Sequence, residues 1–205
     1  RRYLDTIQSA GERGRSLVAQ ILTFSRARPA EKRPMLVAEL VEEVVVQLEG
    51  SLPEGISIKI ANEYPGAVVL GETTQLHQLA MNLCTNAIQA MPVGGEVVLS
   101  VRAVRVGVER AAHIGTLRPG NYIGIGVRDA GPGMDKDTVA RIFEPFFTTK
   151  PVGRGTGLGL SLVQSIALEH GGALDVTSSP GLGTSISVYL PEAEGEWERP
   201  GAPES

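Results

Sequence analysis

Two glycine clusters and one acidic residue are the part of this sequence whose types and spacing most clearly suggest chemistry. Asp129 follows a strand-like apolar run and opens a turn that contains Gly131 and Gly133. A second cluster, residues 155–159, leads directly into an apolar helical run. Glycine lets a backbone approach a ligand closely, and the N–H groups at a helix start suit phosphate. The pattern indicates a nucleotide held at both ends, with the carboxylate accepting from a base amine.

Two asparagines stand one helical turn apart earlier in the chain. Asn82 and Asn86 share one face of a helix that the apolar spacing predicts over residues 73–91. Asparagine is a poor helix former, so two of them in a helix interior suggest a task. An amide oxygen is a good neutral ligand for Mg²⁺, which prefers oxygen and keeps several waters. The alternative is a pair of solvated side chains.

The segment between the two glycine clusters, residues 143–156, contains two prolines and several polar residues, which predicts a flexible cover over the site. It carries Lys150 and Arg154. Their cations could neutralise the charge of the β- and γ-phosphates. The alternative is two solvated loop charges.

Four motifs in this chain, taken in order, resemble the N, G1, F and G2 boxes of sensor histidine kinases. They are residues 82–87, 129–133, 143–147 and 155–159. A lone glycine cluster is a weak signal, whereas four ordered motifs are specific. The resemblance covers the whole chain except an acidic tail and the loop 107–119.

The resemblance implies a role for individual residues. Asn86 is the implied Mg²⁺ ligand, and Asn82 supports the phosphates or the metal. The Thr148-Thr149-Lys150 match favours Lys150 over Arg154, and the hydroxyl of Thr184 is expected near the adenine. The implied nucleotide-binding set is Asn82, Asn86, Asp129, Gly131, Gly133, Phe147, Thr148, Lys150, Arg154, Gly155, Thr156, Gly157, Leu158, Gly159 and Thr184.

The elements that must position these residues follow from hydrophobic periodicity. Helices are predicted over residues 37–48, 73–91, 135–142 and from residue 157 to His170; strands over 56–60, 67–70, 96–106, 122–129, and a closing hairpin around residues 179–181. This order fits an α/β fold, a two-layer α/β sandwich with one mixed sheet and helices on one face. The family's catalytic domain, of the gyrase-like ATPase class, has that architecture.

The N-terminal segment has a different pattern. Residues 1–28 predict a long coiled-coil-like helix, because apolar and small residues recur at alternating steps of three and four. By resemblance it is the second helix of a dimerisation hairpin, so a homodimer is expected through it; the alternative is an amphipathic helix docked on its own domain. Residues 29–34 are a predicted hinge, 35–191 the ATP-binding domain, and 192–205 a disordered acidic tail.

Composition limits the function further. The net charge of −4 argues against a nucleic-acid binder. A single cysteine, Cys84, excludes an internal disulfide and fits the cytoplasm. No window is long and apolar enough to span a membrane, while membrane anchoring of a longer parent protein stays open.

The three histidines carry no sign of catalysis. His170 ends a predicted helix, where an imidazolium is favoured, so a structural role is expected. His113 lies in the loop 107–119, and His77 projects off the asparagine face. None resembles a phosphoacceptor, which in this family stands on the first helix of the hairpin.

The resemblance therefore implies a histidine protein kinase domain that uses Mg·ATP. It transfers the γ-phosphoryl group to a histidine that this sequence lacks, and thence to an aspartate of a response-regulator receiver. The chain alone is expected to bind ATP without phosphorylating itself. Alternatives are a gyrase- or MutL-type ATPase clamp and a non-catalytic nucleotide-sensing module. In the clamps a glutamate activates water at the position of Asn82, and an asparagine cannot act as a base.

Overall fold

The computed structural model describes residues 31–150 and 155–193. The expected helix 1–28, Arg154 and nearly all of the expected tail 192–205 lie outside the described residues. The elements are β1 (Arg33–Leu36), α2 (Val37–Glu49), β2 (Ile56–Asn62), β3 (Val68–Gly71), α3 (Thr73–Ala90), β4 (Gly95–Val106), β5 (Arg110–Ala111), β6 (Thr116–Leu117), β7 (Gly120–Asp129), α4 (Lys136–Arg141), α5 (Gly159–Glu169), β8 (Ala173–Ser178) and β9 (Thr184–Pro191).

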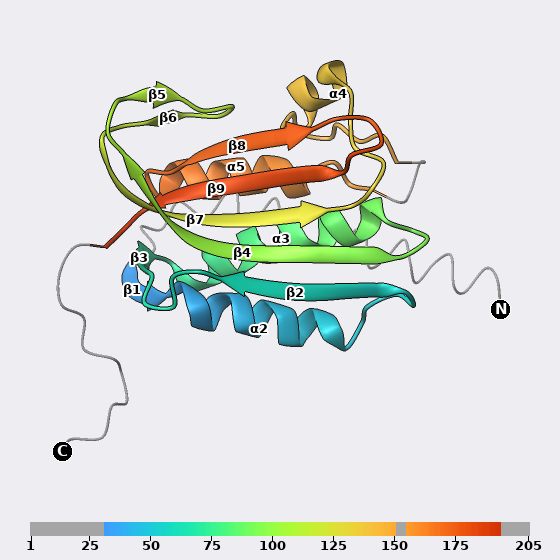
Figure 1. The fold of residues 1–205 in the computed structure, drawn as a ribbon. Coiled ribbons are helices and arrows are strands. Elements are labelled where there is room, and N and C mark those ends of the chain that lie inside the picture. Colours follow the sequence, from blue (N-terminus) through green and yellow to red (C-terminus); the bar gives the residue numbers. More distant parts are fainter. Residues whose placement is uncertain (1–30, 151–154, 194–205) are drawn as a thin grey trace.

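Five strands form one mixed sheet in the order β2-β4-β7-β9-β8. Only β2 and β4 run parallel within it; the other neighbours are antiparallel. Helices α2, α3 and α5 cover one face of this sheet, with α3 between the other two (Figure 1). The predicted two-layer α/β sandwich is confirmed.

The core between the two layers is aliphatic and follows the predicted periodicities. On β4 and β7, alternate residues such as Leu99, Val101 and Ile125 face the helices and are fully buried. On α3 the apolar stripe that packs against them includes Leu76, Leu79 and Leu83, and these side chains are at most 2% exposed. Because both layers contribute to one core, α3 is held rigidly along its length, which fixes the face that carries the asparagines.

Helix α3 has clear signals at both of its ends. Glu72 is the N-cap, and its carboxylate accepts from the backbone N–H groups of Thr74 and Gln75. The helix ends at Ala90, and Pro92 follows two residues later. Proline is common just past a helix end because it cannot continue the helix.

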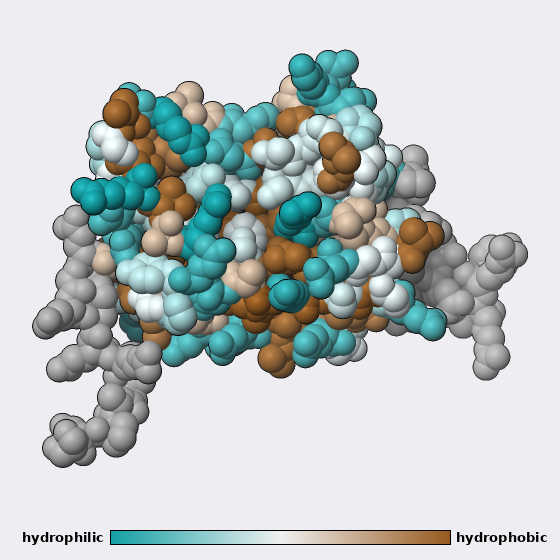
Figure 2. Space-filling model, viewed as in Figure 1, coloured by the Kyte–Doolittle hydropathy of each residue, from teal (hydrophilic) through white to brown (hydrophobic). Residues whose placement is uncertain are grey.

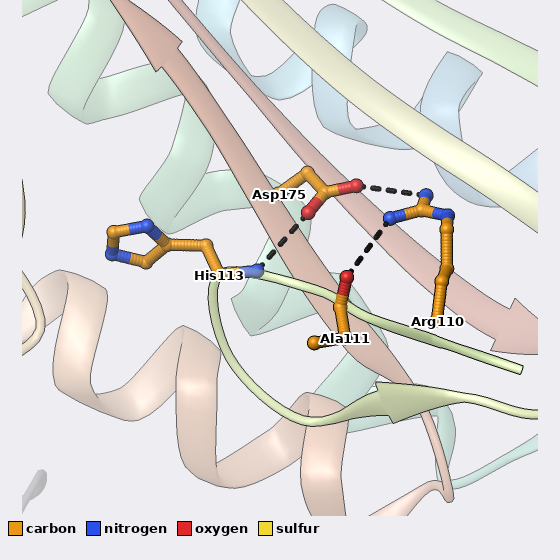
Figure 3. A network of polar contacts seen from close by, with 4 residues as sticks. All are labelled: Arg110, Ala111, His113 and Asp175. Atoms are coloured by element: carbon orange, nitrogen blue, oxygen red, sulfur yellow. Dashed lines mark hydrogen bonds and ion pairs between the residues drawn. The ribbon is translucent and has the colours of Figure 1, made fainter.

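A small hairpin, β5–β6, occupies the region expected to be a loop (residues 107–119). Two backbone hydrogen bonds join Ile114 to Leu174 on the edge strand β8, at 3.0 and 2.9 Å. The carboxylate of Asp175 accepts from the backbone N–H of His113 at 3.0 Å and from the guanidinium of Arg110 at 2.9 Å (Figure 3). The hairpin thus covers part of an edge that would otherwise present unpaired backbone groups.

The other face of the sheet carries mostly short or polar side chains. It includes the exposed cations Lys59, Arg102 and Arg128, and hydrophilic residues are interspersed with hydrophobic ones over the strands (Figure 2). At one end the hairpin β5–β6 covers a second, small apolar cluster, in which Leu117 is fully buried against Tyr122 and Tyr189.

Both ends of the described domain meet at β3. Strand β1 pairs antiparallel with β3, and it begins at Arg33, inside the segment expected to be a hinge. At the other end, Glu192 bridges Val69, and the backbone N–H of Ala193 donates to Val68 at 2.9 Å. No helix among the described residues is long and apolar enough to cross a membrane.

Candidate functional site

A cavity of about 980 Å³ lies where α3, the end of β7 and the start of α5 come together. Its walls combine an apolar part, including Val127, Met134 and Ile186, with a few polar groups. Such a mixture is typical of small-molecule sites, where apolar surface buries the ligand and a few polar groups orient it. Among the lining residues that the structure describes, Asp129 is the only carboxylate and Lys150 the only cation.

Asp129 is the last residue of β7 and is only 7% exposed. Burial raises the pKa of its carboxyl above the ordinary value, and the backbone N–H groups of Gly131 and Thr184 partly offset that rise. The Gly131 N–H donates to Oδ1 at 2.8 Å, which holds the carboxylate in one orientation. Because it is an acceptor-only group when ionised, Asp129 selects a ligand that presents an N–H donor.

Thr184 lies opposite Asp129 in the register of β7 and β9. Its hydroxyl is 2.9 Å from that of Ser178, which in turn accepts from the backbone N–H of Met134. A short hydrogen-bonded network therefore fixes the Thr184 hydroxyl and the turn after Asp129 at the same end of the cavity.

Gly133 shows why the first glycine cluster is needed. Its φ is +67°, and a Cβ atom there would lie 1.9 Å from the carbonyl oxygen of Ser179. Any side chain would push the Asp129 turn away from the loop that joins β8 to β9. The glycine thus lets two backbone segments approach closely and close one end of the cavity.

Asn82 and Asn86 contribute two buried amide groups to the cavity. The Nδ2 atom of each is buried and has no hydrogen-bond partner among the described residues. A buried donor without a partner costs free energy, so a ligand with acceptor atoms would stabilise this arrangement. A Cβ added to Gly159 would lie 3.3 Å from Asn86 Nδ2, so both asparagines face the first turn of α5.

The start of α5 adds donors to the same region. Leu158 is its N-cap residue and makes no side-chain capping bond. Among the described residues, the N–H groups of the first turn, residues 159–161, have no backbone partner either, so they can bind an anion, helped by the helix dipole. Together with the two asparagine amides they form a donor-rich end of the cavity, which suits phosphate. The Asp129 turn lies further along α3, because a Cβ on Gly131 would be 3.0 Å from the carbonyl oxygen of Ala90, the last residue of that helix.

The residues also fit a magnesium ion. The described parts of the chain hold no group of three or more His, Cys, Asp or Glu residues that could form a protein-only metal site. Mg²⁺ commonly takes one or two protein oxygens and completes its shell with phosphate oxygens and waters. The amide oxygens of Asn82 and Asn86, next to the donor-rich end, meet that requirement.

The described residues 143–150, which precede the second glycine cluster, make several contacts. Phe146 has a φ of +67°, and its N–H donates to the carbonyl of Gly157 at 2.9 Å. Gly157 is needed there, because a Cβ would lie 2.4 Å from the Phe146 carbonyl carbon. The Arg141 guanidinium stacks on the Phe147 ring at 4.3 Å from its centroid.

Lys150 reaches from this segment to α3. Its Nζ donates to Gln89 Oε1 at 2.5 Å, and its backbone N–H donates to the hydroxyl of Thr148 at 3.1 Å. Burial lowers the pKa of the Lys150 ammonium below its ordinary value.

Most of the residues singled out from the sequence line this one cavity. The lining includes Asn82, Asn86, Asp129, Gly131, Gly133, Phe147, Thr148, Lys150, Gly155, Thr156, Gly157, Gly159 and Thr184. Leu158, the N-cap residue of α5, does not line it. Arg154 lies outside the described residues.

Sequence reasoning missed part of the site. Gln89, Met91 and Thr138 also line the cavity. Gln89 stands three residues after Asn86 on the same helix face, and that spacing is the signal that could have found it. Met91 and Thr138 carry no such signal, since the sequence pattern predicts a core residue at Met91 and an exposed helix residue at Thr138.

None of the three histidines is among the residues that line the cavity. His170 Nδ1 is 2.7 Å from the Ile166 carbonyl, and the Glu72 N–H donates to Nε2 at 3.2 Å. One nitrogen donates and the other accepts, so the ring is neutral. The expectation of a favoured imidazolium is therefore wrong, because burial lowers the pKa of the ring more than the helix end raises it. His113 packs its ring on Phe143, with 5.7 Å between centroids.

Comparison with known proteins gives consistent matches. Residues 71–194 match the family described as histidine kinase-, DNA gyrase B-, and HSP90-like ATPase. The sensor kinase CckA of Brucella abortus is 35% identical over 90% of this chain and 20% of its own length. The sensory histidine kinase/phosphatase NtrB of Azospirillum brasilense is 34% identical over 86% of this chain and 43% of its own length.

Solved structures agree with these matches. Full-length ShkA, in complex with AMPPNP, superimposes with a TM-score of 0.76 at 28% identity over 95% of this chain and 39% of its own. The catalytic domain of the histidine kinase ThkA superimposes with a TM-score of 0.63 at 26% identity, over 79% of this chain and 96% of its own. The chain spans between 20% and 48% of the length of the first curated relatives.

Proposed function

Because this chain belongs to the family of histidine kinase-, DNA gyrase B- and HSP90-like ATPases, we propose that residues 35–191 are the ATP-binding catalytic domain of a two-component sensor histidine kinase. The proposed reaction moves the γ-phosphoryl group of ATP to a histidine nitrogen and releases ADP. The phosphoryl group then passes to an aspartate of a response-regulator receiver. In this proposal the domain works in the cytoplasm, where ATP is available, whether or not a longer parent protein is anchored to a membrane.

One observation carries this proposal: a single cavity has a buried carboxylate at one end and, at the other, two buried amides without a partner among the described residues. The Asp129 carboxylate would accept a hydrogen bond from the exocyclic amino group of adenine. The Asn82 and Asn86 amides, with the first turn of α5, would bind the phosphates. The two ends thus recognise the two chemically different ends of one nucleotide.

The remaining residues would orient the phosphates and neutralise their charge. Phosphoryl transfer asks the protein mainly for positioning and for charge stabilisation. Lys150 lines the cavity and would supply one positive charge there. Mg²⁺, when bound, would neutralise further phosphate charge, and Asn86 is its proposed protein ligand.

The lining of the cavity supports transfer to an acceptor over hydrolysis. An ATPase clamp needs a base that activates water near the γ-phosphate. Among the described lining residues the only carboxylate is Asp129, at the opposite end, and an asparagine stands at position 82. The clamp ATPase is therefore not favoured.

The proposal includes two partners beyond ATP. A receiver domain takes the phosphoryl group, and a second copy of the chain pairs through residues 1–28, which lie outside the described residues. The acceptor histidine comes from outside this sequence, because His77, His113 and His170 all lie away from the cavity lining.

Radiolabelled ATP tests the proposal. We expect calorimetry to detect ATP binding, and we expect no acid-labile, base-stable label on the chain alone. The chain should transfer the label to a second polypeptide, if that polypeptide carries an acceptor-histidine helix able to pair with residues 1–28. Steady ATP hydrolysis without label would favour the clamp, and label on the isolated chain would make one of its own histidines the acceptor.

A further inference from the structure

Lys150 is the charged group of the cavity whose position the proposed function leaves unexplained. Its ammonium is half-buried, and no carboxylate pairs with it among the described residues. A desolvated cation without an anionic partner is costly in a folded protein. An anionic ligand in the cavity would supply the missing partner.

A neutral side chain, Gln89, holds this ammonium in place. Gln89 lies on α3 one turn after Asn86, and its Oε1 accepts from Lys150 Nζ at 2.5 Å. Both residues line the cavity. The contact joins two parts of the chain that are 61 residues apart, so it sets where the lysine charge stands relative to the two asparagines.

The other end of the lysine is fixed as well. Thr148 accepts from the Lys150 backbone N–H, and a Cβ on Gly155 would lie 3.2 Å from Lys150 Cδ. The backbone and the aliphatic part of Lys150 are therefore packed, and the hydrogen bond to Gln89 sets the position of the ammonium.

We propose that Gln89 is a positioning residue, which holds the Lys150 ammonium on the asparagine face of α3 so that it pairs with a phosphate of the bound nucleotide. The inference rests on the proposed function and names a residue that acts through another. Glutamine suits this role because it accepts from the ammonium without cancelling its charge. A glutamate would cancel the charge, and a lysine or arginine would repel it.

A double-mutant cycle on nucleotide affinity tests this inference. Gln89→Met keeps the length of the side chain and removes the acceptor. We expect it to weaken ADP binding by about 3- to 10-fold, the scale of one ordinary hydrogen bond. Lys150→Met should weaken binding at least as much. In the Lys150→Met background, Gln89→Met should change the dissociation constant by less than about 2-fold, because the group that it positions is gone.

Two controls and one further variant sharpen the test. Gln78→Met removes the same side chain from α3 at a position that does not line the cavity, and it should leave ADP affinity unchanged. Adenosine has no phosphate, so Gln89→Met should not alter its affinity. Gln89→Glu should weaken ADP binding more than Gln89→Met does, because its carboxylate pairs with Lys150.

The outcomes separate this inference from the proposed function. A wild-type chain that binds neither ADP nor ATP would overturn the proposed function itself. If the wild type binds ADP but the Gln89→Met loss is equal in both Lys150 backgrounds, Gln89 contacts the nucleotide directly or acts through the fold, and the inference is wrong. Thermal unfolding of each variant, measured without nucleotide, identifies losses that come from the fold.

Discussion

At the scale of single residues, Asp129 shows how burial and hydrogen bonding set a chemical role. The carboxylate is nearly inaccessible, and backbone N–H groups hold it at the end of β7. Asp129→Asn gives the side chain a donor as well as an acceptor. We expect a loss of about 1–3 kcal/mol of ATP binding free energy with little change in thermal unfolding. An unchanged calorimetric affinity would remove Asp129 from the site.

Asn86 differs from Asp129 in that its effect should depend on the metal. If its amide oxygen binds Mg²⁺, Asn86→Ala should weaken ADP binding in the presence of Mg²⁺ more than in its absence, by about tenfold against a few-fold. Titrating ADP in Mg²⁺ and in a chelator measures both losses. Equal losses would mean that Asn86 has only a structural role or binds phosphate directly.

His170 gives a pH dependence of folding. The folded ring is neutral, and its pKa lies below the ordinary value of 6.5, with burial as the main cause. Below pH 6.5 the unfolded chain therefore takes up a proton that the folded chain does not. The stabilisation is complete above that pH and is lost as the pH falls toward the folded pKa.

Urea unfolding measures this effect at pH values from about 5 to 7.5, a range that brackets the ordinary pKa of histidine. The free energy of unfolding should fall on the acid side, and His170→Gln should flatten that part of the profile. A profile that keeps the same slope in the variant would assign the dependence to other groups.

At the scale of elements, one carboxylate adds to the backbone hydrogen bonds and the apolar contacts that hold the hairpin β5–β6 on the sheet. Asp175 accepts from the His113 N–H and from Arg110. Asp175→Ala should destabilise the fold by about 1–2 kcal/mol, because it removes two hydrogen bonds, one of them charged. The amide of Ile114 should then exchange faster with solvent than amides of the central strands. Arg110→Ala is the matched control, and as the loss of a partly exposed ion pair it should cost under about 1 kcal/mol.

The same hairpin shows where sequence reasoning fails. Residues 73–90 and 95–106 were predicted almost to the residue, because long elements repeat a clear hydrophobic period. Strands of two residues, such as β5 and β6, contain no period. They form because Ile114 finds an unpaired edge on β8, and that edge exists only in the folded sheet.

Within the site, the residues that carry a local signature were predicted and the tertiary contacts were not. Asp129, with its glycine turn, and the asparagine pair can be recognised from spacing alone. The hydrogen bond between Gln89 and Lys150 and the left-handed backbone of Phe146 depend on how distant segments meet. A neutral ring at His170 was also beyond a sequence argument, because burial outweighs the helix end.

At the scale of the whole molecule, the site joins parts that are far apart in the chain. Asn86 comes from α3, Asp129 from the end of β7 and Thr184 from β9, and they meet only when the sheet is complete. ATP binding is therefore also a measure of complete folding, since a ligand that binds only the native state stabilises it.

The meeting of both ends of the domain at β3 has a consequence for chain connectivity. Arg33 pairs with Gly71 at one end of β3, and Ala193 bonds to Val68 at its other end. The length of this short strand, roughly 10 Å, therefore separates the two ends of the domain. A linker of a few residues could join them, and new ends could open in the exposed loop of residues 107–109, between β4 and β5. Such a circular permutant would keep every strand neighbour of the five-stranded sheet. The domain can thus be inserted into another protein at one point, because the chain enters and leaves it at neighbouring positions.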